Sequence, residues 1–351
     1  MCRLDYTKHL IDQGSTVREA LIRLDALAAD AILFIIDQEK HFLGSLTDGD
    51  LRRGFIKGLN LEASLLTFAN KQPKCIEQGN YDLHTIISLR KNDFTVLPVI
   101  NRDNQIINVV NFKYQKSYLP VDALIMAGGR GERLRPLTDT IPKPLLPVGG
   151  KPILEYNIDR LRDFGIDDLW ISLRYLGEQI ENCFKDGAAK SIRIKYIYEN
   201  SPLGTVGAAR LVDAWKHDTL LLMNSDLLTN LDFEEFYLHF LKEDADLSVV
   251  TIPYEVKVPY AIFELMQNNI LSLKEKPTYT YFSNAGIYLM KREVLSLIPE
   301  SIRFDATDLV ESLIQEGRKV TSFPFLGYWL DIGRMEDYEK AKRNLHLVHF
   351  R

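Results

Sequence analysis

A short apolar strand runs straight into a glycine-rich loop near the middle of this 351-residue chain, and few folds accommodate such a junction. Residues 123–126 are all apolar, and the chain continues as Ala127-Gly128-Gly129-Arg130-Gly131. Glycines directly after a strand let the backbone approach a phosphate closely and point its N–H groups at the anion. The loop has neither the Gly-Lys-Ser/Thr ending of a Walker loop nor the Gly-x-Gly-x-x-Gly spacing of a dinucleotide-binding loop. The sequence therefore predicts a phosphate-binding loop of another type.

Strands and helices alternate after this loop. Residues 169–173, 192–198 and 220–223 are predicted strands, and helical patterns cover residues 151–161, 177–184 and 208–215. Such alternation indicates βαβ units and a parallel sheet whose ligand binds at the carboxyl ends of the strands. We expect an α/β fold with a Rossmann-like, mostly parallel sheet.

Two cations, Arg133 and Lys143, follow the glycines. A guanidinium grips two phosphate oxygens at once and an ammonium is a point charge, so the two suit different phosphates of one triphosphate. The stretch from Met126 to Lys151-Pro152 resembles the signature of sugar-1-phosphate nucleotidyltransferases, Gly-Gly-x-Gly-x-Arg-Leu-x-Pro-Leu-Thr, then Pro-Lys-Pro-Leu and Lys-Pro. The resemblance implies catalytic roles for Arg133 and Lys143. It also implies a nucleotide-binding loop made of Ala127, Gly128, Gly129 and Gly131.

Two aspartates match the metal-binding positions of that family. Asp226 follows the apolar residues 220–223, and Asp331 lies in Tyr328-Trp329-Leu330-Asp331-Ile332-Gly333, which resembles the family's Trp-x-Asp-Ile-Gly. The resemblance implies that both hold Mg²⁺, and two carboxylates completed by triphosphate oxygens and water suit that ion. Taken separately, Asp226 is also compatible with a helix N-cap and Asp331 with a turn.

Further segments match the sugar-binding and base-binding positions. Glu275 and Lys276 resemble the family's Glu-Lys-Pro, which implies that Glu275 accepts hydrogen bonds from sugar hydroxyls and that Lys276 holds the sugar's phosphate as a catalytic residue. Asn284 and Gly286 match the strand beneath the sugar. Without the resemblance, residues 274–276 are an ordinary solvated turn.

The segment 199–208 matches the part of the family that reads the base, with Glu199 and Gly204 as the nucleotide-binding residues. A glutamine at the first position pairs with a pyrimidine edge that presents a donor and an acceptor. Glutamate offers only acceptors, which suit the two neighbouring donors of guanine. This favours GTP.

The first 118 residues contain an internal repeat. Residues 32–46 and 96–110 each predict a strand, a tight turn and a strand, 64 positions apart, with a helical pattern before each. The pair resembles tandem CBS domains, and Gly44-Ser45-Leu46-Thr47-Asp48-Gly49-Asp50 resembles that family's nucleotide-binding segment. The resemblance implies a regulatory nucleotide site with Thr47 near phosphate and Asp50 on the ribose. The alternative is a pair that only dimerises or supports the second domain.

The resulting prediction is a CBS pair over residues 1–118 and a nucleotidyltransferase domain over residues 122–351. The enzyme would transfer a nucleotidyl group from GTP to glucosamine 1-phosphate and release pyrophosphate, because the fusion resembles bacterial guanylyltransferases that serve surface or flagellin glycosylation. Mannose, heptose or another hexose 1-phosphate and another base remain alternatives. A different class, a nucleotide-sensing regulatory protein without catalysis, is the competing hypothesis.

The composition limits which classes of partner the chain can bind and which cellular compartment suits it. The 43 basic and 48 acidic residues give a net charge of −5, which excludes a positive field for nucleic acid. Residues 1–6 lack the apolar core of a signal peptide, and the apolar run 31–36 is too short to span a bilayer. The chain has three cysteines, Cys2, Cys75 and Cys183, which lie far apart in the sequence. This number and spacing are typical of isolated thiols in a reducing compartment. We expect a cytoplasmic homo-oligomer with no nucleic-acid or membrane partner.

Overall fold

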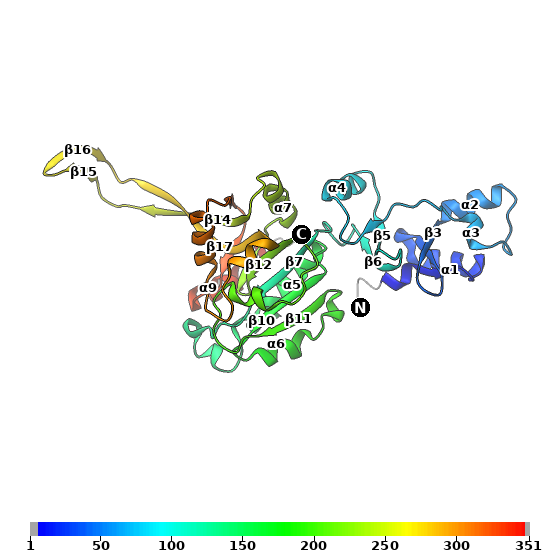
Figure 1. Ribbon diagram of the computed structural model, residues 1–351, viewed down its shortest axis with the longest axis horizontal. Coiled ribbons are helices and arrows are strands. Elements are labelled where there is room, and N and C mark those ends of the chain that lie inside the picture. Colours follow the sequence, from blue (N-terminus) through cyan, green and yellow to red (C-terminus); the bar gives the residue numbers. More distant parts are fainter. Residues whose placement is uncertain (1–5, 348–351) are drawn as a thin grey trace. The chain divides into compact units, whose positions relative to one another are not determined.

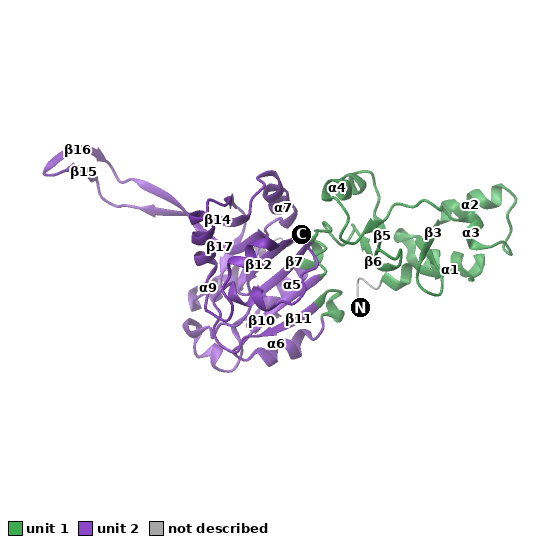
Figure 2. Cartoon of the chain, in the orientation of Figure 1, with its two compact units in different colours: residues 1–120, 161–167, 187–193 green, residues 121–160, 168–186, 194–351 purple. Residues whose placement is uncertain are grey.

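The computed structural model describes residues 6–347, so Cys2 lies outside the described residues. The chain forms two compact units (Figures 1 and 2). One takes the chain up to residue 120 together with residues 161–167 and 187–193, and the other takes the remainder. None of the helices between residues 6 and 347 has the length and apolar character that crossing a bilayer requires.

The N-terminal unit contains two similar three-stranded sheets, which confirms the predicted strand–turn–strand repeat. In each sheet the first strand is parallel to the second, and the second is antiparallel to the third. The elements of the first copy are β1 Leu10–Asp12, α1 Val17–Leu27, β2 Ile32–Ile36, β3 Phe42–Thr47, α2 Asp48–Ile56 and α3 Leu65–Phe68. Those of the second are β4 Ile76–Glu77, α4 Leu83–Lys91, β5 Val96–Ile100 and β6 Ile106–Asn111.

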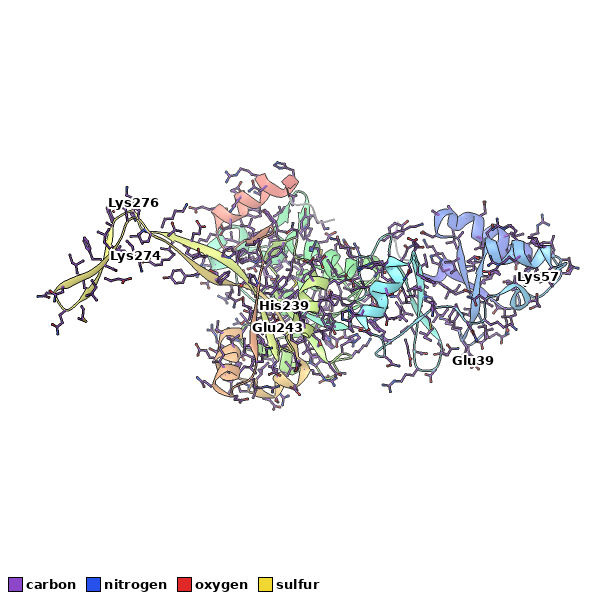
Figure 3. The ribbon with its side chains drawn as sticks, turned by 90° about the horizontal axis from the view of Figure 1, so that it is seen from above. Glu39, Lys57, His239, Glu243, Lys274 and Lys276 are labelled. Carbon is purple, nitrogen blue, oxygen red and sulfur yellow. The ribbon has the colours of Figure 1, made fainter. Side chains whose placement is uncertain are left out.

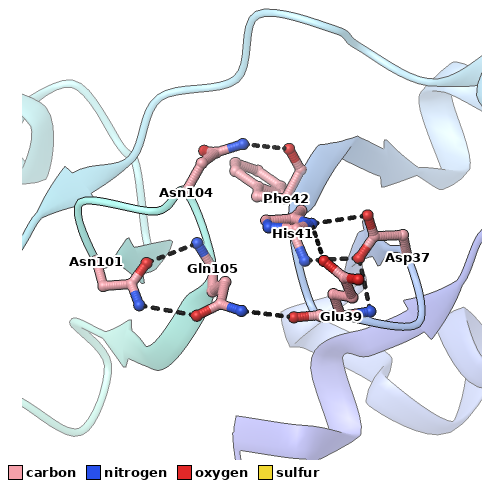
Figure 4. A network of polar contacts seen from close by, with 7 residues as sticks. All are labelled: Asp37, Glu39, His41, Phe42, Asn101, Asn104 and Gln105. Atoms are coloured by element: carbon pink, nitrogen blue, oxygen red, sulfur yellow. Dashed lines mark hydrogen bonds and ion pairs between the residues drawn. The ribbon is translucent and has the colours of Figure 1, made fainter.

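The β2–β3 and β5–β6 turns bond to each other (Figure 4). The N–H of Phe42 donates to the carbonyl of Asn104 at 2.8 Å, and the N–H of Ile106 donates to the carbonyl of Lys40 at 3.1 Å. Side-chain amides add two more bonds, from Asn104 Nδ2 to the carbonyl of Phe42 and from Gln105 Nε2 to the carbonyl of Glu39. The repeats are therefore joined through their backbones.

The second unit is built on a seven-stranded sheet with the order β11-β10-β7-β12-β17-β14-β18. Its strands are β7 Val121–Met126, β10 Asp168–Leu173, β11 Arg193–Tyr198, β12 Thr219–Asn224, β14 Leu247–Lys257, β17 Thr278–Lys291 and β18 Val320–Pro324. β7 is parallel to β10 and β12, whereas β17 is antiparallel to both of its neighbours. The predicted α/β class with a mostly parallel sheet is confirmed.

The helices of this unit are α5 Ile153–Asp163, α6 Gly177–Phe184, α7 Phe233–Lys242, α8 Ala306–Gln315 and α9 Met335–Asn344. The apolar spacing that predicts α5 is confirmed, because Ile153, Leu154, Ile158 and Leu161 are all fully buried. The predicted helix over residues 208–215 is wrong. A 3₁₀ helix covers only Gly207–Leu211, and Val212 is already extended. A β-branched residue there favours extended backbone over another helical turn.

β14 and β17 continue beyond the sheet as a two-stranded arm, drawn in yellow and olive in Figure 1. Their pairing runs on to Lys257 opposite Thr278. The end of the arm is a second hairpin, β15 Ile262–Met266 and β16 Asn269–Lys274. Nearly all of its side chains are exposed, in contrast to the sheet portion of the same strands.

Candidate active site

A cavity of about 420 Å³ opens where β7, β10 and β12 end. Because β7 is parallel to both neighbours, the residues that follow these strands meet at one edge of the sheet. The cavity is lined by Ala127, Gly128, Gly129, Gly131, Lys143, Glu199, Gly204 and Asp226 among the predicted site residues. Eight positions spread over a hundred residues of sequence are thus brought together.

The glycine loop presents its backbone to this cavity. Ala127 N–H still bonds to the carbonyl of Ser172. In the described part of the chain, the N–H groups of Gly128 and Gly129 donate to no other group. Gly131 has φ +64°, a left-handed conformation that glycine adopts without strain. Free N–H groups of this kind are what a phosphate needs.

Lys143 connects the two predicted metal ligands. Its Nζ contacts Asp226 Oδ2 and lies 3.9 Å from Asp331 Oδ1. The aspartates come together because β13 Leu227–Thr229 pairs with β19 Trp329–Asp331, with Leu227 opposite Asp331. Burial and the neighbouring Asp226 carboxylate raise the pKa of Asp331 to about 6.

The carboxylates fit a divalent cation. Asp226 Oδ1 and Asp331 Oδ1 are both buried, and neither accepts a hydrogen bond. Buried carboxylate oxygens are costly unless a proton, a donor or a cation satisfies them. Asp226 is not a helix N-cap, since it is followed by β13. Mg²⁺ takes one or two carboxylates and keeps phosphate oxygens and water as its other ligands.

Glu199 and Gly204 also line the cavity, with Glu199 beside Gly128 of the glycine loop. Glu199 Oε2 accepts the N–H of Leu203 at 3.2 Å, and burial raises the pKa of the Glu199 carboxyl. Gly204 has φ +79°, and a Cβ built there would lie 2.5 Å from the carbonyl oxygen of Phe304. Only glycine fits this close approach of two backbone segments.

The other predicted residues do not line the cavity. Arg133 is exposed, although its charge is near enough to lower the pKa of Asp331. Gly286 packs beside the cavity, since a Cβ there would lie 2.4 Å from the Asn224 amide nitrogen, and its N–H donates to Asn284 Oδ1. Glu275 and Lys276 lie on the exposed arm, and Figure 3 shows Lys276 away from the sheet.

The polar residues of the cavity that sequence reasoning missed include Arg174, Asn224 and Arg303. Arg174 follows β10 as Asp226 follows β12. The expectation that ligands bind at the carboxyl ends of parallel strands was therefore sufficient to find Arg174. Asn224 is the last residue of β12. Arg303 is brought in by the chain before α8, and nothing local in the sequence indicates it.

Thr47 and Asp50 form a capping box at the start of α2. The N–H of Asp50 donates to Thr47 Oγ1, while Asp50 Oδ2 accepts the N–H and the hydroxyl of Thr47 at 2.9 and 2.6 Å. Asp50 Oδ1 pairs with Arg53 at 2.5 Å. Both carboxylate oxygens are therefore already engaged within the helix end.

Comparison with known proteins places this chain in a family. Residues 122–347 match the family model "Nucleotidyl transferase". The chain is 30% identical over 243 residues to UTP–glucose-1-phosphate uridylyltransferase of Synechocystis, covering 64% of this chain and 63% of that protein. It is 30% identical over 235 residues to mannose-1-phosphate guanylyltransferase of Mycobacterium tuberculosis, covering 64% of each. The chain thus spans less than two-thirds of the length of either relative.

A solved structure is similar as well. HddC from Yersinia pseudotuberculosis complexed with GMP-PN has a TM-score of 0.50 and 27% identity, covering 64% of this chain and 99% of HddC. The family match covers well over half of the sequence, and its range begins one residue into the strand that carries the glycine loop. The chain belongs to the nucleotidyl transferase family of enzymes.

Proposed function

We propose that this chain transfers a nucleotidyl group from a nucleoside triphosphate to a sugar 1-phosphate. An oxygen of the sugar phosphate attacks the α-phosphorus, the bond between this phosphorus and the β-bridging oxygen breaks, and pyrophosphate leaves with the electron pair. The observation that supports this most strongly is that the glycine loop, Lys143 and Asp226 line one cavity, with Asp331 Oδ1 3.9 Å from the Lys143 Nζ. Two polyanions must meet there, so positioning and charge neutralisation carry the catalysis.

Each residue has a distinct task. The loop N–H groups hold the triphosphate, Lys143 stabilises charge on the α-phosphate, and Arg133 grips the leaving pyrophosphate. Asp226 and Asp331 would hold Mg²⁺, which neutralises phosphate charge when bound. Lys276 orients the sugar phosphate, and Glu275, Asn284 and Gly286 contact the sugar.

GTP is the proposed nucleotide. Glu199 is the supporting residue, because an acceptor-only side chain in the cavity suits the adjacent N1–H and amino donors of guanine. One relative is a guanylyltransferase and HddC was solved with GMP-PN, whereas the Synechocystis relative is named for UTP. The relatives therefore agree on nucleotidyl transfer and differ in the base.

Glucosamine 1-phosphate is the proposed acceptor, with mannose, heptose or another hexose 1-phosphate as alternatives. A CBS-type regulatory nucleotide at Thr47 and Asp50 stays a prediction. Its test is the kinetics of Asp50→Ala with added nucleotides, where unchanged kinetics would remove an allosteric role.

Pyrophosphate release from a panel of nucleoside triphosphates and sugar 1-phosphates tests the function. Lys143→Ala should lower kcat by about 10²- to 10³-fold, the usual cost of losing one transition-state charge contact. Lys216→Ala is the matched control, because Lys216 also pairs with a well-buried aspartate, Asp168 at 2.8 Å. The control should keep its activity. A wild-type chain that binds nucleotide but releases no pyrophosphate with any pair would support the non-catalytic sensing alternative instead.

A further inference from the structure

Three neighbouring strands of the central sheet end beside one another at the cavity. β11, β10 and β7 are adjacent in the sheet, and they are followed by Glu199, Arg174 and the glycine loop. The N–H of Glu199 donates to the carbonyl of Leu173 at 2.9 Å, and the N–H of Ala127 donates to the carbonyl of Ser172 at 3.0 Å. Backbone bonds therefore fix the chain on which Glu199 and Arg174 stand.

The Glu199 and Arg174 side chains flank one glycine of the loop. A Cβ on Gly128 would lie 3.1 Å from Glu199 Oε1 and 3.4 Å from Arg174 Cβ, and both residues line the cavity. Burial is the main influence on the pKa of Glu199 and raises it, while the charge of Arg174 acts in the opposite direction. An acidic and a basic side chain are thus close neighbours at this end of the cavity.

Arg174 is a cation without a protein partner. Its side chain is exposed, and the described part of the chain gives it no hydrogen bond or ion pair. By contrast, Arg303 pairs with Asp305 at 3.1 Å and Lys143 contacts a predicted metal ligand. Of the three cations that the described residues place in the cavity lining, only Arg174 is therefore free to bind a ligand.

The base is the part of the nucleotide that lies nearest to Arg174. The two ends of the glycine loop face different side chains, because a Cβ on Gly131 would lie 3.1 Å from Lys143 Cβ, whereas Gly128 lies beside Arg174. The phosphate and metal contacts proposed above belong to the Gly131 end. The Gly128 end carries Glu199, which is the residue proposed to read the base.

Glutamate and arginine together match guanine better than any other common base. Glu199 offers only acceptors, which suit the N1–H and the 2-amino group, and Arg174 offers only donors, which suit O6 and N7 on the next edge of the ring. In protein–DNA complexes a guanidinium that binds O6 and N7 at once is the commonest specific contact to guanine. Adenine reverses the pattern, since its N1 accepts and its 6-amino group donates. Pyrimidines have no N7.

We propose that Arg174 is a specificity-determining residue whose guanidinium donates to O6 and N7 of guanine, while Glu199 accepts from N1–H and the 2-amino group. This inference rests on the function and the nucleotide proposed above. It adds a second residue and a second edge of the base to the selection of GTP.

Equilibrium binding of GTP and of 7-deaza-GTP tests the contact. 7-Deaza-GTP has a carbon in place of N7 and keeps the edge that Glu199 reads. The wild type should bind it about 5- to 20-fold more weakly than GTP, the lower range for a hydrogen bond to a charged group, because Arg174 is exposed. Arg174→Met keeps the length of the side chain but has no donor, so it should bind the two nucleotides equally.

Arg303→Met is the matched control, because Arg303 is also an exposed arginine of the cavity but is paired with Asp305. This variant should keep the wild-type ratio of the two dissociation constants. A wild-type ratio near one, or an unchanged ratio in Arg174→Met, would overturn the contact with N7, and the second result is what an arginine bound to phosphate gives. A wild type that binds UTP or ATP but not GTP would overturn it as well.

The titration requires no turnover, so it separates this inference from the proposed reaction. If the wild type releases no pyrophosphate with any pair of substrates, the proposed reaction fails, while the binding ratio still decides the role of Arg174. If pyrophosphate is released and Arg174→Met keeps the wild-type ratio, the reaction stands and the role of Arg174 fails.

Discussion

Replacing Glu199 by glutamine tests how the cavity selects its base. Glu199 Oε2 is occupied by the N–H of Leu203, which leaves Oε1 near Gly128, 3.1 Å from where a Cβ on that glycine would stand. Glutamine has the same size and shape but replaces one acceptor oxygen with a donor amino group. If the amide oxygen stays with Leu203, its amino group meets the two donors of guanine.

The cost of this exchange follows from the hydrogen bonds. Whichever way the Glu199→Gln amide turns, one buried donor faces another donor, and an unsatisfied buried donor costs about 1–3 kcal/mol. That corresponds to roughly 5- to 150-fold in kcat/KM for GTP. A uracil edge, which has a donor beside an acceptor, loses less, so the GTP-to-UTP ratio should fall by the same order.

The assay is steady-state pyrophosphate release with GTP and with UTP at one sugar 1-phosphate, for wild type and Glu199→Gln. Burial raises the folded pKa of Glu199 above 4.5, so its contribution to stability is present below that pH and is lost as the pH rises through the folded pKa. Glutamine imitates the protonated form, and the variant should be no less stable at pH 7. A stable variant with an unchanged GTP-to-UTP ratio would refute a contact between residue 199 and the base.

Three other measurements test metal binding, the pH dependence of stability and the backbone conformation at Gly204. Mg²⁺ should raise the melting temperature of the wild type but not of Asp226→Asn, because an ion bound only by the folded chain stabilises it. The guanidinium of Arg318 lies 2.8 Å from Asp246 Oδ1 and lowers the pKa of that carboxyl to about 2. The stabilisation of the folded chain by this ion pair is therefore complete above about pH 4 and is lost as the pH falls toward 2. Arg318→Met should therefore remove about 1 kcal/mol of that acid dependence in urea unfolding, after allowance for solvent screening. Gly204→Ala should cost about 2–4 kcal/mol, because a left-handed φ is combined with a backbone clash. Gly317→Ala, with φ +71° and open space, should cost only about 1 kcal/mol, and equal losses would contradict the clash.

Strand ends were the most informative part of the sequence. Asp226 and the glycine loop follow continuous apolar runs, and such runs are typical of parallel strands buried on both faces, so their meeting at one sheet edge was predictable. Lys143 begins a short 3₁₀ helix, and the family motif rather than any periodicity identified it. Glu199 directly follows β11, but only the family motif gave it a role in reading the base. Arg303 had no local indication, because only the tertiary fold brings the chain before α8 to the cavity.

The arm was beyond local reasoning for a different reason. The residues from Ile262 to Lys274 form a hairpin of apolar-rich strands, and such strands are ordinarily covered by a sheet or helix. Whether a partner element covers them is decided by distant parts of the chain, which no local pattern contains. The family motif therefore identified Lys276 while leaving its position in space open.

The bonds between the two N-terminal turns connect positions that the repeat makes equivalent. His41 and Gln105, which are 64 residues apart, form an antiparallel bridge. Phe42 and Ile106 are equivalent positions of the two repeats, as are Lys40 and Asn104, so the bond from Phe42 to Asn104 and the bond from Ile106 to Lys40 are equivalent as well. The contact is self-complementary, so a lone repeat would present to an identical copy the groups that it meets here in its neighbour. This contact has the symmetry of a homodimer interface, but it forms between two segments of one chain. Deleting either half would leave the N–H and carbonyl groups of the surviving turn to water or to an identical copy.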